Sequence, residues 1–242
     1  MLALATMNNP DLSIIIPALN EELGILPLIK TIKEVADQLR INYELVLVDD
    51  GSTDNTGAVM ENLTKTDQLI KVTVIHNQKP LNVGYAFWQG VQKAQGKYVT
   101  MVAGDNEISR QALINLLGRI DQVDLITSYP TNIGIRPLSR RIISWMYVFI
   151  LNIIFGLRLK YFNGSCLIRR DLLEQLPIWT SGFAFMSEIA IQLIKNGATY
   201  EEVPAPLQPR LGGKSKALSF KNFYLVAKTI GGLWWRVYFT KK

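Results

Sequence analysis

The sequence contains almost no cysteine or histidine. Among its 242 residues there is one cysteine, Cys166, and one histidine, His76. A single cysteine excludes an internal disulfide and is typical of a protein in a reducing compartment. A single histidine excludes any metal site that needs several histidine ligands.

Other features are also missing. The first residues, "MLALATMNNP", have no basic segment before their short apolar run, so no secretory signal is predicted. No segment has the spacing of a Walker-type phosphate loop, which argues against a nucleoside triphosphatase. The sequence also lacks repeats, low-complexity tracts and nucleic-acid-binding motifs, so nucleic acid is not an expected partner.

The composition is that of a globular protein with an uneven charge. Apolar residues make up 48% and charged residues 19%, and the length favours one α/β domain with appendages. Residues 1–135 carry 10 Lys and Arg against 15 Asp and Glu, whereas residues 136–242 carry 16 against 5. The second part is therefore predicted to face an anionic surface, unless its charges form a solvated face without a partner.

Strand and helix patterns alternate along the chain. Short apolar runs predict strands at residues 12–17, 44–50, 70–76, 97–105 and 123–129. Helical spacing or a capping residue predicts helices at 21–40, after Ser52 and Thr53, at 85–94 and after Ser109. Strands that alternate with helices predict an α/β fold with a mostly parallel sheet and helices on both faces.

Polar side chains follow three of these predicted strands. They are Asn20 and Glu21, Asp49 and Asp50, and Asp105 and Glu107. Ligands of such sheets bind beyond the carboxyl ends of the strands, and crowded acids there need a cation or hydrogen-bond donors. A divalent metal that bridges a nucleoside diphosphate would meet this need. Each pair also has a simpler interpretation, as turn residues, helix caps or first-turn acids.

Four segments resemble a known family. They are "IIIPALNEE", "LVLVDDGSTDNT", "NVGYAFWQGVQKAQGKYVTMVAGDNE" and "EVPAPLQPRLGGKSK". Together they resemble family 2 glycosyltransferases of the GT-A fold, and among these the dolichyl- and polyprenyl-phosphate sugar synthases. The resemblance runs from Leu12 to Lys216. It implies a GT-A domain over residues 1–216. The remaining residues, 217–242, are predicted from their aromatic and basic composition to form an amphipathic helical tail.

The resemblance implies where the sugar donor, a UDP- or GDP-linked sugar, binds. The first loop lies against the base and ribose, two acids read the base, and one glycine lies beside the diphosphate. In this chain the matching residues are Pro17, Ala18, Asn20 and Glu21, then Asp49 and Asp50, then Gly84.

The D-x-D motif of the family is incomplete in this chain. Asp105 matches its last acid, which binds metal and diphosphate, but Ala103 stands where the first acid belongs. Glu107 provides a further oxygen two residues on. Together with phosphate oxygens and waters, Asp105 and Glu107 are predicted to hold Mg²⁺ or Mn²⁺.

The resemblance also places residues near the transferred group and the acceptor. Glu188 matches an acid at the start of a helix that orients sugar hydroxyls or acts as a base, although it could equally be an ordinary first-turn acid. The run "GSCLIRR" (164–170) matches a strand near the acceptor, without the acid that often precedes it. A glycine-rich lid is predicted to bind phosphates through Arg210, Lys214 and Lys216, and Arg136 is a further candidate.

Two stretches indicate a membrane surface. Residues 142–157, "IISWMYVFILNIIFGL", contain no charge and are flanked by arginines. They are short for a span, so the sequence predicts a helix about 138–158 that lies in the interface, with a buried core helix as the alternative. The tail mixes aromatics such as Trp234 and Trp235 with Lys and Arg. We therefore expect a peripheral protein on the cytoplasmic face of an anionic membrane, without a transmembrane helix.

The expected reaction moves a hexosyl group from a nucleoside-diphosphate sugar to a polyprenyl phosphate, with inversion at the anomeric carbon. Two alternatives stay open: a glycolipid or saccharide acceptor, and a nucleotide-sugar-binding protein without catalysis, which the missing acid at Ala103 would favour. The sequence also leaves open a homo-oligomer.

Overall fold

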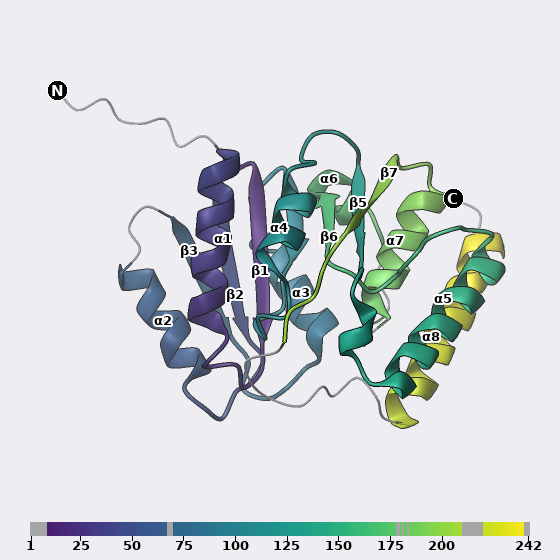
Figure 1. Ribbon diagram of the computed structural model, residues 1–242, viewed down its shortest axis with the longest axis horizontal. Coiled ribbons are helices and arrows are strands. Elements are labelled where there is room, and N and C mark those ends of the chain that lie inside the picture. Colours follow the sequence, from purple (N-terminus) through teal and green to yellow (C-terminus); the bar gives the residue numbers. More distant parts are fainter. Residues whose placement is uncertain are drawn as a thin grey trace.

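Seven strands form one mixed sheet in the order β3-β2-β1-β4-β6-β5-β7 (Figure 1). The computed structural model describes residues 9–66, 70–177, 180, 182, 184–209 and 220–239, with only the backbone of 66 and 220–227. The strands are β1 Leu12–Ala18, β2 Tyr43–Asp49, β3 Lys71–His76, β4 Tyr98–Met101, β5 Leu125–Tyr129, β6 Cys166–Arg169 and β7 Tyr200–Pro204. The helices are α1 Ile25–Leu39, α2 Thr56–Thr66, α3 Val83–Val91, α4 Arg110–Leu117, α5 Leu138–Phe155, α6 Arg170–Glu174, α7 Phe185–Lys195 and α8 Phe220–Phe239, with a 3₁₀ turn at Ile133–Ile135.

Helices cover both faces of the sheet, as the alternating pattern predicted. Successive side chains of a strand point to opposite faces. In β1, Ile14 and Ile16 pack with α1 and α4, whereas Ile15 packs with α3 and α7. All seven residues of β1 are buried, which explains why its sequence is a continuous apolar run. The α/β sheet of the predicted GT-A class is thus confirmed.

One strand runs against the others. β6 is antiparallel to β4 on one side and to β5 on the other, while the remaining pairs are parallel. β6 carries Cys166, whose complete burial raises the pKa of the thiol to about 12. This cysteine is therefore a packing residue and not a nucleophile.

The helices α5 and α8 lie side by side at one end of the sheet, next to α7 (Figure 1). Leu151 and Phe155 of α5, Ile191 of α7 and Leu233 of α8 form a small core of their own. Tyr238 of α8 also donates a hydrogen bond to the carbonyl oxygen of Ile154, at 3.3 Å. Both helices are thus fixed to the domain along one side.

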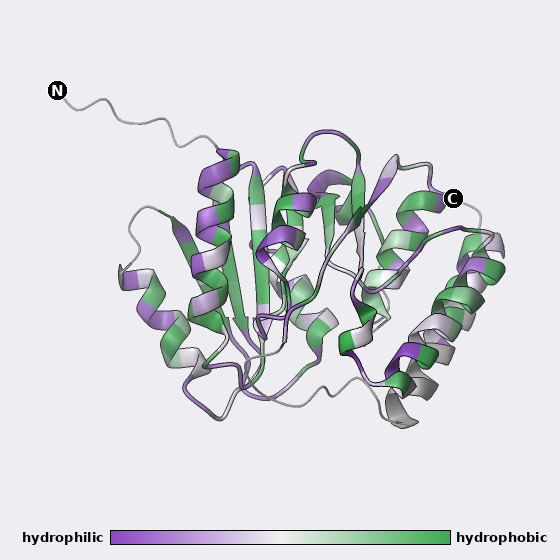
Figure 2. Cartoon of the chain, viewed as in Figure 1, coloured by the Kyte–Doolittle hydropathy of each residue, from purple (hydrophilic) through white to green (hydrophobic). Residues whose placement is uncertain are grey.

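The opposite side of these two helices is apolar and exposed. In Figure 2, hydrophobic colours cover much of α5 although it stands at the rim of the molecule. Only 11% of the residues of α5 are buried, so the alternative interpretation of this segment as a buried core helix is wrong. Among the described helices, α5 alone has the length and apolar composition that a membrane crossing requires. The exposed residues, here called the apolar face, are Leu138, Ile142, Ile143, Trp145, Met146, Phe149, Ile150 and Ile153 of α5 and Trp234, Trp235 and Phe239 of α8.

Candidate active site

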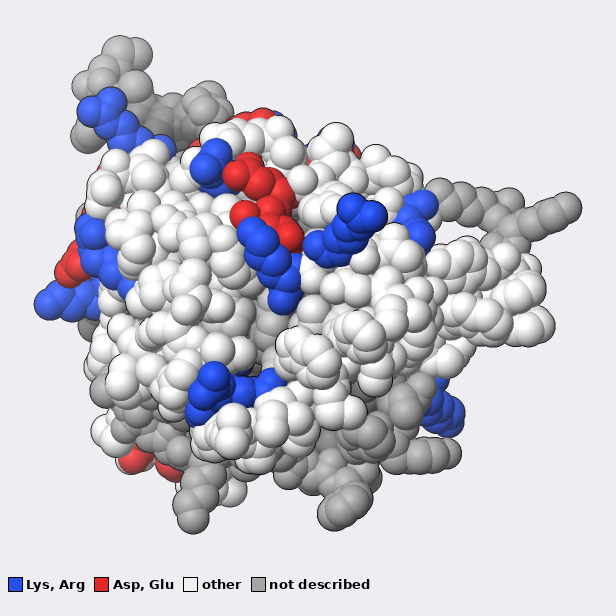
Figure 3. Space-filling model, turned by 45° about the vertical axis from the view of Figure 1, so that its right-hand side comes forward, with Lys and Arg blue, Asp and Glu red and all other residues white. Residues whose placement is uncertain are grey.

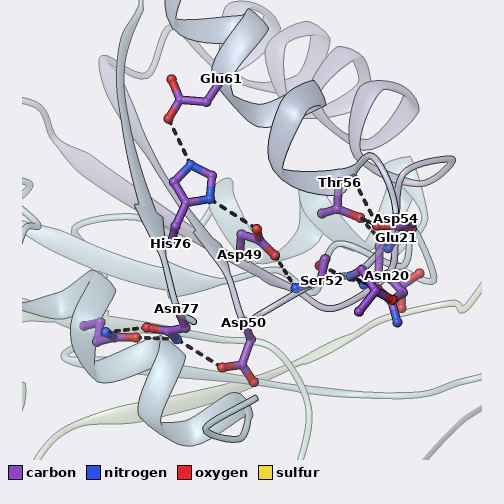
Figure 4. A network of polar contacts seen from close by, with 12 residues as sticks. Asn20, Glu21, Asp49, Asp50, Ser52, Asp54, Thr56, Glu61, His76 and Asn77 are labelled. Atoms are coloured by element: carbon purple, nitrogen blue, oxygen red, sulfur yellow. Dashed lines mark hydrogen bonds and ion pairs between the residues drawn. The ribbon is translucent and has the colours of Figure 1, made fainter. Parts of the chain in front are cut away.

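The loops that follow β1 and β2 are joined by reciprocal hydrogen bonds (Figure 4). The N–H of Asn20 donates to Ser52 Oγ at 3.0 Å, and the N–H of Thr53 donates to Asn20 Oδ1 at 2.8 Å. The N–H of Glu21 donates to Thr56 Oγ1 at 2.8 Å. Asn20 has a φ of 58°, a left-handed conformation that asparagine tolerates better than most residues. Asn20 and Glu21, two predicted donor-site residues, therefore link the loop after β1 to the loop after β2.

The two acids after β2 have different partners. Asp49 accepts the N–H of Ser52 through Oδ1 at 2.9 Å, and its Oδ2 lies 3.1 Å from His76 Nδ1. The contact with Ser52 is the local turn that the simpler interpretation of this segment predicted. Asp49 is only 7% exposed, so few oxygen lone pairs stay open to a ligand.

Asp50 fixes the segment that leads into α3. It accepts hydrogen bonds from Asn77 Nδ2 at 3.0 Å, from the N–H of Leu81 at 2.8 Å and from the N–H of Asn82 at 3.1 Å. Gly84 follows in the first turn of α3 and is buried. Asp50 thus determines where the N-terminus of α3 points, at the edge where a diphosphate is expected.

The loop after β4 presents Ala103, Asp105 and Glu107 on its exposed side. These three residues are partly exposed, whereas the residues between them, Gly104 and Asn106, are buried. Asp105 Oδ1 accepts the N–H of Glu107 at 3.1 Å, which holds the two acids close together. The methyl group of Ala103 takes the place of the missing acid.

This loop packs tightly on the first loop. The N–H of Gly104 donates to the carbonyl oxygen of Pro17 at 3.0 Å. A Cβ atom added at Gly104 would lie 2.7 Å from Ala18 Cβ and 2.9 Å from Ile25 Cδ1. Pro17 and Ala18, predicted to line the donor site, are therefore joined to the acidic loop through a glycine that sequence reasoning missed.

We expect Gly104→Ala to lower the free energy of unfolding by about 1–3 kcal/mol, because the added methyl group forces the two loops apart. Urea unfolding of the purified protein measures this change. Gly134→Ala is the matched control, since a Cβ at Gly134 would meet no heavy atom within 4 Å. Equal stability of the two variants would contradict the tight packing of these loops.

Arg136 reaches this acidic loop from the segment before α5. Its Nη2 lies 3.7 Å from Glu107 Oε2, and its Nη1 donates to Tyr161 Oη at 3.1 Å. The side chain is 12% exposed, and its buried Nε has no hydrogen-bond partner among the described residues. Arg136 therefore pairs with Glu107 at the acidic loop and brings positive charge to this side of the site.

The predicted lid follows a segment that also lies on this loop. The N–H of Gln208 donates to the carbonyl oxygen of Glu107 at 2.9 Å, and Gln208 Nε2 donates to that of Asn106 at 2.7 Å. Ile108 and Leu207 form an isolated antiparallel bridge. The predicted phosphate-binding residues of the lid, Arg210, Lys214 and Lys216, lie outside the described residues.

Glu188 lies in the first turn of a helix, as its match in the family implied, but its side chain is fully buried. In the first turn of α7 it has 0% exposure. Its Oε1 lies 3.1 Å from Arg236 Nη2 of α8, and its Oε2 accepts the N–H of Thr180 at 3.1 Å. Direct contact between Glu188 and a sugar would require Arg236 to move.

The acids of the loop after β4 suit a nucleotide-bound cation. Among the described residues no group of three or more His, Cys, Asp or Glu side chains could hold a metal ion by itself. Mg²⁺ in nucleotide sites usually binds one or two carboxylates together with substrate phosphates and waters. Asp105 and Glu107 supply that number of carboxylates, so the residues present fit such a cation.

The sheet and the polar loops at its carboxyl edge define an α/β protein of the GT-A class. Residues 13–176 match the family described as Glycosyl transferase family 2. The chain belongs to this family.

Two curated relatives and one solved structure illustrate the likeness. "Uncharacterized protein MJ0544" of Methanocaldococcus jannaschii is 30% identical over 78% of this chain and 84% of its own length. Dodecaprenyl-phosphate galacturonate synthase of Rhizobium johnstonii is 23% identical over 78% of this chain and 59% of its own length. Glucosyl-3-phosphoglycerate synthase from Mycobacterium tuberculosis, crystallised with Mg²⁺ and uridine diphosphate, has a TM-score of 0.69 at 18% identity, covering 96% of this chain and 81% of that one. At this identity the structural likeness shows the fold.

Proposed function

We propose that this glycosyltransferase moves a hexosyl group from a UDP- or GDP-linked sugar to the phosphate of a polyprenyl lipid, at the surface of a membrane. The observation that carries the lipid part is the apolar face, which begins beside the candidate active site. Arg136, which pairs with Glu107, lies two residues before the start of α5. The relative named for dodecaprenyl phosphate supports the same acceptor class.

The donor would bind across the carboxyl edge of β1, β2 and β4. The joined loops around Asn20 and Asp49 are suited to the nucleoside, and the start of α3 at Gly84 to the diphosphate. Asp105 and Glu107 would hold Mg²⁺ or Mn²⁺, which, when bound, neutralises charge on the departing diphosphate. These residues therefore stabilise the leaving group, where fixed charge contributes most to such a transfer.

The acceptor's phosphate would lie on the Arg136 side of the site. A phosphate oxygen forms the new bond to the anomeric carbon, while the bond to the diphosphate oxygen breaks and its electron pair leaves with the diphosphate. Attack from the opposite side inverts this carbon. A lipid phosphate is already anionic near pH 7, so the step requires no strong base. The guanidinium of Arg136, which is 12% exposed, would supply positive charge for such an anion.

The apolar face would lie in the lipid–water interface. Trp145 and Phe149 stack with ring centroids 5.5 Å apart, and Trp145 is 66% exposed. Figure 3 shows wide uncharged stretches of surface on this side, with Lys and Arg at separate places around them. Because α5 is fixed to α7 through Leu151 and Phe155, we assign it to the interface and not to a span.

The test combines vesicles with a transfer assay. The protein is incubated with radiolabelled UDP- and GDP-sugars, Mn²⁺ and anionic vesicles that contain polyprenyl phosphate, and labelled lipid is counted. Wild type is expected to form glycolipid and to sediment with the vesicles at low salt, with partial release at high salt because surface attraction is screened.

A double variant, Trp145→Ser with Phe149→Ser, is expected to lose at least tenfold in both sedimentation and transfer, because it removes exposed aromatics that interfaces favour. Tyr200→Ser, on β7 and also exposed, is the matched control. Sugar transfer to a soluble phosphorylated acceptor, with none to the lipid, would contradict the proposed lipid acceptor.

A further inference from the structure

The only histidine of the chain lies between two carboxylates (Figure 4). His76 ends β3, its Nδ1 lies 3.1 Å from Asp49 Oδ2 at the end of β2, and its Nε2 lies 2.9 Å from Glu61 Oε1 on α2. The sequence places His76 at the carboxyl edge, but no pattern in it indicates this arrangement.

Both contacts can be hydrogen bonds only when the imidazole is protonated. A neutral imidazole has one N–H, so one of its two nitrogens would then turn a lone pair toward a carboxylate. The hydrogen bond with Glu61 and the hydrogen bond with Asp49 raise the pKa of His76, and together they outweigh the effect of burial. The raised pKa extends the charged state toward neutral pH.

The backbone around this contact permits the close approach. Gly57, in the first turn of α2, has no side chain where a Cβ would lie 2.8 Å from Asp49 Oδ2 and 3.2 Å from the His76 ring. A larger residue there would separate α2 from both groups. The arrangement of Asp49, His76 and Glu61 therefore depends on this glycine.

β3 packs against β2, α2 and, through Ile75, α3. Only β2 and α2 carry charges that face His76, because α3 contains no Asp, Glu, Lys or Arg. Those charges are Asp49 and Glu61. The other acid of β2, Glu44, pairs with Lys71 at the opposite end of the strands, at 2.9 Å. Lys65 lies in the last turn of α2, beyond Glu61.

From His76 the contacts continue into the loops proposed to hold the nucleoside. Asp49 accepts the N–H of Ser52, and Ser52 Oγ accepts the N–H of Asn20. The orientation of the Asp49 carboxylate is thus set on one side by the Ser52 turn and on the other by His76.

We propose that protonated His76 is a positioning residue for the donor nucleotide, so that nucleotide binding and proton binding at His76 strengthen each other. This inference rests on the proposed function. Loss of the proton would turn a lone pair toward Asp49 or Glu61 and disturb the Asp49 carboxylate, which holds the Ser52 turn and, through it, the Asn20 loop. It would also remove one positive charge from the edge of the sheet where the anionic diphosphate is proposed to bind. Both effects would weaken nucleotide binding as the pH rises and His76 loses its proton.

Because the chain has a single histidine, proton NMR can follow its imidazole signal without ambiguity. Saturating UDP or GDP with Mg²⁺ is expected to raise the His76 pKa by about 0.7 unit, the shift that matches a fivefold coupling. Calorimetry is expected to show the same roughly fivefold weakening of nucleotide binding between pH values below and above that pKa.

Two variants test the role of each contact. Glu61→Gln should lower the His76 pKa and move the pH at which affinity falls downward with it, while Asp49 is untouched. His76→Gln should bind nucleotide with the weaker, alkaline affinity at every pH.

The outcomes separate the inference from the function. Nucleotide binding with an unchanged His76 pKa would overturn the coupling and leave the proposed function standing. No binding of UDP or GDP at any pH would overturn both. A role confined to fold stability would lower the melting temperature as pH rises through the raised pKa, without any change of that pKa on adding nucleotide.

Discussion

Asp105→Asn is expected to reduce sugar transfer at least a hundredfold while the melting temperature stays within a degree or two of wild type. The substitution keeps the shape of the side chain and the oxygen that accepts the Glu107 N–H, but removes the negative charge. Losing one preorganised electrostatic contact to the reacting groups typically costs a factor of about 10²–10³ in rate. Initial rates of glycolipid formation with saturating donor and Mn²⁺ measure the loss.

Asp37→Asn is the control, since Asp37 is an exposed acid near the end of α1, at the opposite edge of the sheet. A companion variant, Ala103→Asp, restores the first acid of the motif and should lower the Mn²⁺ concentration that gives half-maximal rate. If Asp105→Asn were fully active and the wild-type rate were indifferent to a chelator, Asp105 would not be the metal-binding acid.

Arg236→Met should lower the free energy of unfolding by about 3 kcal/mol, the lower end of the range for breaking a buried ion pair. The substitution leaves the Glu188 carboxylate, which is 0% exposed, without the guanidinium that lies 3.1 Å away. Arg236 itself is 24% exposed, which places the effect at the lower end. Chemical unfolding followed by circular dichroism measures the difference.

Lys228→Met, an exposed cation on the same helix, is expected to change stability little. The double variant Glu188→Met with Arg236→Met should recover most of the loss, because a buried pair replaced by apolar groups is often neutral. Its transfer activity then decides the role of Glu188. Full activity in the stable double variant would exclude Glu188 from contact with the sugar.

The sequence predicted β1 to β5 from apolar runs bounded by turn residues, and the family resemblance marked the segment of β6. β4 ends at Met101, four residues before its predicted end at 105, and β7 was not predicted, because most of its residues are only partly buried or exposed. β1, predicted at 12–17 and observed at Leu12–Ala18, is the clearest case. Ser109, predicted as a helix cap, accepts the N–H of Ala112. The polar residues at the carboxyl edge were also predictable, since parallel strands bring their ends together.

Contacts between distant segments could not be predicted. Neither the pairing of Arg136 with Glu107 nor the burial of Glu188 by Arg236 leaves a local pattern, because each depends on how helices pack after the sheet forms. The requirement for glycine at position 104 could not be predicted either, because it arises from contact with Ala18, which is far away in the sequence. The reversed direction of β6 depends on its pairing with β4 and β5, which its four residues do not encode.

This reversed strand has a consequence for how the molecule can change. Neighbouring antiparallel strands can be joined by a hairpin of two residues, yet β5 and β6 are separated by residues 130–165, which include all of α5. The sheet does not require this excursion. Exchange of this segment for another could therefore alter the proposed acceptor side, while the loops after β1, β2 and β4, where the donor is proposed to bind, stay unchanged.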